Sequence, residues 1–181
     1  MNLRYLLTLL FALTFTAPAF AANWQGEFHL TAYDASGAEL WSEIAPNSLA
    51  DEGEHLLLDV ALRGGTAPTQ YFLRLFNDTP IETDTLAALT GQPSTNGYAA
   101  QLVERSNVGW PTLALDSGDF QAVSKEVTFT ASGGSWGPVS HCVLATSSDN
   151  TGKLISFAAL SQARTLAAGE TLRVTYRVKL Q

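Results

Sequence analysis

Five consecutive residues, Gly133–Gly137, carry the Gly-x-Ser-x-Gly pattern of a hydrolase nucleophile elbow, with Ser135 in the place of the nucleophile. In that motif a sharp turn from a strand into a helix lifts the serine above a parallel sheet. Here Pro138 and another strand-like segment follow the glycines, so the sequence does not supply the helix. Glycine and proline at this density are typical of a loop between antiparallel strands. We therefore predict a loop here and no catalytic residue.

The three histidines, His29, His55 and His141, lie far apart in the sequence, and none has a second ligand at the spacing of a zinc site. Strand alternation predicts that His29 faces solvent. A triad or a metal site assembled by the fold stays open as an alternative.

Acidic residues gather in two places, between Asp78 and Asp84 and again at Asp116 and Asp119. Paired carboxylates could serve a glycosidase, and several oxygens together could bind calcium. Neither group has the regular spacing of a calcium-binding loop. Because Asp and Asn beside Pro, Ser and Gly are typical turn residues, we predict turns, with no metal and no cofactor.

Four tryptophans are numerous for a chain of this length, and they could fill the core or form a contact surface. Trp110 and Trp136 adjoin Gly and Pro in predicted loops. The sequence therefore makes these two residues the candidates for surface contact with a sugar or a protein.

The net charge of −7 over 181 residues argues against a nucleic-acid partner, since phosphate binding needs clustered Lys and Arg. The same acidity disfavours binding to an anionic membrane surface. Cys142 is the single cysteine, so no intrachain disulfide forms, and its apolar surroundings predict a buried thiol.

The first residues have the parts of an export leader. Arg4 precedes an apolar run, Leu6–Phe15, and Pro18 and Ala19-Phe20-Ala21 follow it. A short basic segment, a short apolar core and a small-x-small site are typical of a signal peptide. We expect Met1–Ala21 to be a leader that is cleaved, after which no stable membrane association remains. The alternative is an uncleaved hydrophobic assembly arm.

The rest of the chain reads as short strands with frequent turns. Leu172–Gln181 alternates apolar and polar residues, which predicts a half-buried strand. Leu49–Leu62 has an acidic start and a glycine stop and favours a helix, although its alternation also allows a strand at His55–Leu62. Strands are further predicted at 27–32, 38–44, 71–76, 126–131, 140–146 and 153–158, with one or two helical turns at 83–89.

This pattern predicts an all-β fold, an antiparallel β-sandwich of Ig-like or jelly-roll-like type with one short helix. Residues 22–181 suit a single domain, in which residues 22–64 form an N-terminal hairpin-plus-helix portion. Gly64–Thr69 is the only weak boundary candidate.

A series of short segments spread over the C-terminal part of the chain follows a pattern of spacing and turn chemistry. They are 47–53, 71–76, 83–86, 96–99, Trp110, 120–122, 127–131, 144–147, 152–155, 160–166 and 168–172. From Tyr71 to Gln181 the chain thereby resembles small structural proteins of tailed bacteriophages. The resemblance implies a β-rich, homo-oligomeric subunit of a head, tail or fibre, and it transfers no catalytic residue.

Two functions follow as hypotheses. The first is a non-enzymatic virion structural or assembly protein that contacts other virion proteins and copies of itself. The second is an exported β-sandwich binding module for glycans or a surface protein, which would be periplasmic or secreted. The absence of a readable catalytic motif favours the first.

Overall fold

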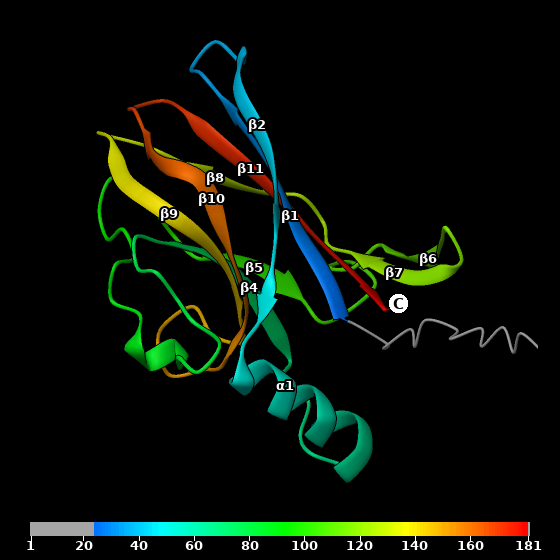
Figure 1. Cartoon of the computed structure of the whole chain (residues 1–181). Coiled ribbons are helices and arrows are strands. Elements are labelled where there is room, and N and C mark those ends of the chain that lie inside the picture. The colour runs from blue at the N-terminus through cyan, green and yellow to red at the C-terminus, as the bar shows by residue number, and fades with distance from the viewer. Residues whose placement is uncertain (1–23, 181) are drawn as a thin grey trace, which may run out of the picture.

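The computed structural model describes residues 24–180, so the predicted leader, Met1–Ala21, lies outside the described residues. Figure 1 shows two layers of strands with one helix at the end of the sandwich. The strands are β1 (Trp24–Tyr33), β2 (Glu39–Pro46), β3 (Ser48–Leu49), β4 (Gln70–Phe76), β5 (Gln101–Glu104), β6 (Thr112–Asp116), β7 (Asp119–Val123), β8 (Val127–Thr130), β9 (Trp136–Ala145), β10 (Leu154–Leu166) and β11 (Thr171–Leu180). Helix α1 (Asp51–Leu58) continues as a π-helical turn, Asp59–Arg63, and a 3₁₀ turn covers Leu86–Ala88.

The strands form two antiparallel sheets. One follows the order β2-β1-β11-β7-β6, with β8 also paired to β11, and the other follows the order β3-β10-β9-β4-β5. Their facing sides enclose one large apolar cluster, whose members include Phe28, Leu75, Phe129, Leu144 and Tyr176. The antiparallel sandwich predicted from the sequence is confirmed.

Strand β11 is the centre of the six-stranded sheet. Leu172, Val174, Tyr176 and Val178 are buried, whereas the residues between them lie towards solvent, as alternation predicted. One edge of β11 pairs with β1 over its whole length. The other edge pairs with β8 in the first half of β11 and with β7 in the second half. Two consecutive strands therefore share one edge of β11.

Strand β4 lies between β5 and β9 and is covered on both faces, as its continuous apolar sequence predicted. The one charged residue within it, Arg74, is only 2% exposed. Its guanidinium donates hydrogen bonds to Gln92 Oε1 (2.7 Å), the Asp149 carbonyl (2.8 Å) and Asn150 Oδ1 (2.8 Å). Burial of this cation is therefore offset by hydrogen bonds that tie two loops to the sheet.

Of the predicted segment Leu49–Leu62, Leu49 ends β3 and the residues from Asp51 onward are helical, so the competing strand at His55–Leu62 is wrong. Gly64, in a left-handed conformation (φ 75°), ends the π-helical turn, as the glycine stop predicted. A strand would have required a partner, but α1 instead packs against β10, where Gly53 lies over the backbone of Ile155. In residues 24–180 no helix is long and apolar enough to cross a membrane.

The hairpin β6–β7 was absent from the elements that the sequence predicted. Its two-residue loop, Ser117-Gly118, has positive φ at both positions (55° and 98°), which is the geometry of a type I′ turn. In Figure 1 this hairpin projects beyond the sandwich at the right of the view.

Candidate functional site

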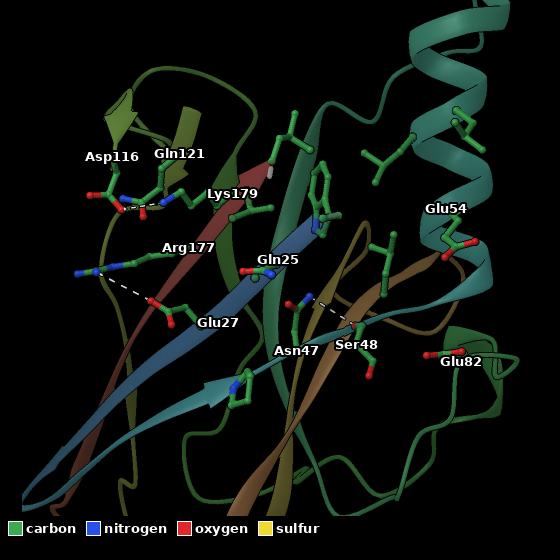
Figure 2. A pocket seen from close by; sticks show the side chains of 18 residues that line it. Gln25, Glu27, Asn47, Ser48, Glu54, Glu82, Asp116, Gln121, Arg177 and Lys179 are labelled. Carbon is green, nitrogen blue, oxygen red and sulfur yellow. Dashed lines mark hydrogen bonds and ion pairs between the residues drawn. The ribbon is translucent and has the colours of Figure 1, made fainter. Parts of the chain in front are cut away.

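A groove of about 890 Å³ opens between α1 and the ends of β1 and β11. Figure 2 shows its polar side chains arranged on both sides of these strand ends. The lining residues are Trp24, Gln25, Gly26, Glu27, Pro46, Asn47, Ser48, Leu49, Glu54, Leu57, Leu58, Glu82, Asp116, Gln121, Arg177, Val178, Lys179 and Leu180.

Charges in the groove are distributed unequally. Lys179 Nζ lies 3.4 Å from an Asp116 carboxylate oxygen and 3.7 Å from one of Asp119, so this cation offsets part of the negative charge of the two carboxylates. On the helix side, Glu54 and Glu82 contribute carboxylates that no hydrogen bond or ion pair within residues 24–180 engages. The helix side of the groove is thus acidic beside apolar residues, a surface suited to contact rather than to proton transfer.

Beneath the groove, Asn47 reaches a buried polar crossing between the two sheets. Asn47 Nδ2 donates to Tyr176 Oη (3.1 Å), and Ser156 Oγ donates to the same oxygen (3.3 Å). Burial raises the pKa of Tyr176 above its ordinary value, so the phenol stays protonated. A Cβ at Gly26 would lie 2.5 Å from both Asn47 Oδ1 and Tyr176 Oη, which explains glycine at this position.

The helix wall of the groove is held in place by Glu52. Its Oε2 accepts hydrogen bonds from the amides of Leu86 (3.0 Å) and Leu154 (2.8 Å), and its Oε1 pairs with Lys153 (3.1 Å). Partial burial of the carboxylate opposes ionisation, but the two amides and Lys153 together outweigh it and lower the pKa of Glu52. Glu52 therefore fastens α1 to β10 as an anion.

The candidate hydrolase motif forms a loop, as predicted. Strand β9 begins at Trp136, directly after Ser135, so the helix of a nucleophile elbow is missing. The Ser135 carbonyl accepts a hydrogen bond from Asn96 Nδ2 (2.6 Å). This contact ties the loop between β8 and β9 to the segment that precedes β5.

The histidines do not come together in a site. His29 lies beside Glu27 on β1, while His55 lies on α1. His141 is buried, and burial lowers its pKa, while its Nδ1 lies 2.9 Å from Ser140 Oγ. Ser140 in turn donates to the carbonyl of Asp78, a contact that fastens a loop to β9.

The acidic clusters make turns and ion pairs. Asp78 accepts a hydrogen bond from the Gly91 amide (2.6 Å), and Asp84 accepts one from the Ile81 amide (3.0 Å). Within residues 24–180, no group of three or more His, Cys, Asp or Glu side chains is placed to hold a metal ion.

The two tryptophans predicted as contact residues occupy different environments. Trp136 is 3% exposed and packs against Tyr98 in the core, so its predicted surface role is wrong: its backbone leaves a loop while its ring points inward. Trp110 is half-buried and meets Tyr71 and Tyr176 edge to face. A contact role for Trp110 stays a prediction.

Sequence reasoning did not propose Asn47, Glu54 or the apolar hairpin β6–β7 as functional. Asn47 and Glu54 are brought near Trp24 only by the crossing of β3 and α1 over the strand ends, which no local pattern specifies. The hairpin has a usable signal, the turn sequence Asp-Ser-Gly-Asp between alternating apolar residues.

Residues 48–178 match the model of a protein family described as Podophage GP4 fiber I protein gp80. The matched range runs from β3 through α1 and the whole five-stranded sheet almost to the end of β11. The chain belongs to this family. A search of the curated proteins finds no match.

Membership in the fiber I family gives the chain a structural role associated with the tail or fibre of a phage particle. The resemblance predicted from the sequence is confirmed. The hairpin of β1 and β2 precedes the matched range, yet β1 pairs with β11 along all ten of its residues. One wall of the groove therefore comes from outside the family segment.

Proposed function

We propose that the chain is a non-enzymatic structural subunit that attaches to, or builds, a phage fibre through contacts with other virion proteins and with copies of itself. The observation that carries this proposal is the fiber I family match over residues 48–178. The observed side-chain geometry supports it, because the conspicuous features are contact surfaces. They are the acidic and apolar groove beside α1 and the exposed apolar hairpin β6–β7.

The alternative of an exported module for glycans has lost part of its support. It depended on the leader together with Trp110 and Trp136 as aromatic platforms, but Trp136 lies in the core and Trp110 packs against Tyr71 and Tyr176. A sugar-stacking platform needs an exposed aromatic face. We therefore put the structural role first.

For Met1–Ala21 we propose a cleaved leader, on the strength of its small-x-small site. The intact mass of the chain recovered from its native source tests this proposal. A chain that begins at Ala22 supports cleavage. A chain that retains Met1 contradicts it and favours the hydrophobic assembly arm.

The structural role is tested by fractionating a lysate on a density gradient and following the chain with peptides from 24–180. We expect the chain in the particle band at a constant ratio to other tail proteins, through a second gradient and a high-salt wash. A chain found only with unassembled protein, or only in the periplasm or medium, would overturn the proposal.

A further inference from the structure

Strand β6 is the outermost strand of the six-stranded sheet, and within residues 24–180 it pairs only with β7. All five of its residues, Thr112–Asp116, are exposed. Leu113 is 73% exposed and Leu115 is 64% exposed. Large apolar side chains at this exposure on a sheet edge are unusual in a protein that acts alone.

The hairpin register shows which backbone groups β6 presents outward. The two-residue type I′ loop makes Asp116 and Asp119 the closing hydrogen-bonded pair. Because antiparallel pairs alternate, Leu115–Phe120 and Leu113–Ala122 are non-hydrogen-bonded pairs. The N–H and C=O groups of Leu113 and Leu115 therefore point away from β7, toward the free edge.

The other edges of the two sheets carry features that discourage pairing. Strand β2 has Glu39, Glu43 and Pro46 together with a bulge opposite β1. Strand β3 has only two residues, and β5 and β8 have four each. Charges, proline, bulges and shortness all protect sheet edges against unwanted partners. Strand β6 carries no charge from Thr112 to Leu115.

One face of the hairpin is apolar throughout. The pairing register puts Leu113, Leu115, Phe120 and Ala122 on the same side, and Ala122 lies opposite the buried Val178 of β11. This face therefore continues the core side of the six-stranded sheet beyond the sandwich. Phe120 is 58% exposed there.

The sequence of β6 is complementary to itself. If two copies run antiparallel about a two-fold axis at Ala114, Leu113 of one strand faces Leu115 of the other, and Thr112 faces Asp116. In this arrangement no charged residue faces one of the same sign. The outward N–H and C=O groups of Leu113 in one copy lie opposite those of Leu115 in the other, where they can form hydrogen bonds. Lys179 offsets part of the charge of Asp116 and Asp119, which reduces repulsion between two acidic chains.

We propose that β6 pairs with β6 of a second copy of this chain, which joins two six-stranded sheets, satisfies the outward backbone groups of β6 and brings the leucines of the two strands side by side. The inference rests on the proposed function and deepens it, because it names the surface through which the subunit self-associates.

Sedimentation velocity of the full chain over a range of concentrations tests the pairing. We expect wild type to sediment with an even number of copies, and Leu113→Lys to halve the mass. Leu115→Pro should do the same, since it removes an outward N–H without breaking the β6–β7 ladder. Ile44→Lys is the matched control, because Ile44 is 58% exposed on β2 and should leave the mass unchanged. Circular dichroism checks that each variant is folded.

Cysteine cross-linking tests the register. The axis at Ala114 brings the two Ala114 residues into a non-hydrogen-bonded pair, with Cα atoms about 4.5 Å apart. That spacing suits a disulfide. We expect Ala114→Cys to form a covalent dimer under mild oxidation, and Ser42→Cys on the β2 edge to remain uncrosslinked. The native Cys142 is buried and should not react.

A chain that is monomeric at every concentration would overturn the inference. An oligomer that is insensitive to both β6 variants, without the Ala114→Cys cross-link, would also overturn it, because another surface would then join the copies. Neither result changes what the fractionation test would find, because that test asks only whether the chain is in the particle. The β6 interface can therefore fail while the virion role holds, and the reverse.

Discussion

Gly26 lies where β1 passes the hydroxyl of Tyr176 and the side chain of Asn47. A Cβ there would lie 2.5 Å from an oxygen of each neighbour. We predict that Gly26→Ala lowers the free energy of unfolding by about 1–3 kcal/mol, the usual range for overpacking. Urea denaturation measures the change.

The neighbouring residue supplies the control for this substitution. Gln25 lies on the same strand with its side chain exposed, so Gln25→Ala should change the free energy of unfolding by less than about 0.5 kcal/mol. Equal stability of Gly26→Ala and wild type would show that β1 does not cross Tyr176 this closely.

Because of Glu52, we predict that the stability of the protein depends on pH. Its folded pKa lies below the ordinary value of 4.5, so its stabilisation is complete above that pH and is lost as the pH falls through the folded pKa. Glu52→Gln keeps an amide acceptor but loses the charge, which should cost about 1 kcal/mol near neutral pH. Denaturation at several pH values measures the difference in stability between wild type and Glu52→Gln, which should narrow as the pH falls below 4.5.

The pKa values of other carboxyl groups are also lowered in the folded protein. The contribution of Glu52 to the pH dependence is therefore measured as the difference between wild type and Glu52→Gln. Hydrogen bonds from Ser147 and Thr151 lower the pKa of Asp149 to about 2, and this group remains in the variant. A gap between wild type and Glu52→Gln that stays constant from neutral to acid pH would contradict the account.

The burial of a residue could be predicted from the sequence only where its neighbours along the chain determine it. Cys142 was expected to be buried because apolar residues surround it in a strand, and it is 1% exposed. Trp136 was misplaced because neighbouring Gly and Pro indicate the path of the backbone, whereas the direction of the ring depends on Tyr98 and the opposite sheet.

At the scale of elements, alternation identified β1, β8 and β11, since each has one face on the core and one toward solvent. The hairpin β6–β7 was missed for the opposite reason. All of β6 is exposed and no residue of β7 is fully buried, so the apolar residues of the hairpin were not recognised as the buried face of a sandwich strand. Only the turn sequence marks them.

Helix α1 yields a prediction in which tertiary packing opposes helix propensity. Alanine is favoured over glycine by about 1 kcal/mol in a helix interior, yet a Cβ at Gly53 would overlap the carbonyl oxygen of Ile155. We predict that Gly53→Ala destabilises the protein by about 1–3 kcal/mol, as overpacking against a backbone does. Thermal and urea denaturation measure this.

His55→Ala serves as the control, because His55 is exposed on the same helix and the change should be neutral or slightly stabilising. A stabilised Gly53→Ala variant would contradict the close packing of α1 on β10.

At the scale of the whole molecule, we propose that residues 22–181 form a single domain. The N-terminal hairpin contributes Phe28, Leu30 and Ala32 to the cluster that also contains β9 and β11 residues. We therefore predict one cooperative unfolding transition, with coincident curves from tryptophan fluorescence and far-ultraviolet circular dichroism. Two separated transitions would show that the hairpin-plus-helix portion unfolds on its own.

The central claim is that this fiber I family member is a structural part of the tail or fibre. Electron microscopy of purified particles, labelled with gold-conjugated antibody against residues 24–180, tests it most directly. The account predicts gold at the tail or its fibres at a regular position, with none on particles from a phage that lacks the gene. Unlabelled wild-type particles, despite free chain that binds the antibody, would contradict the account.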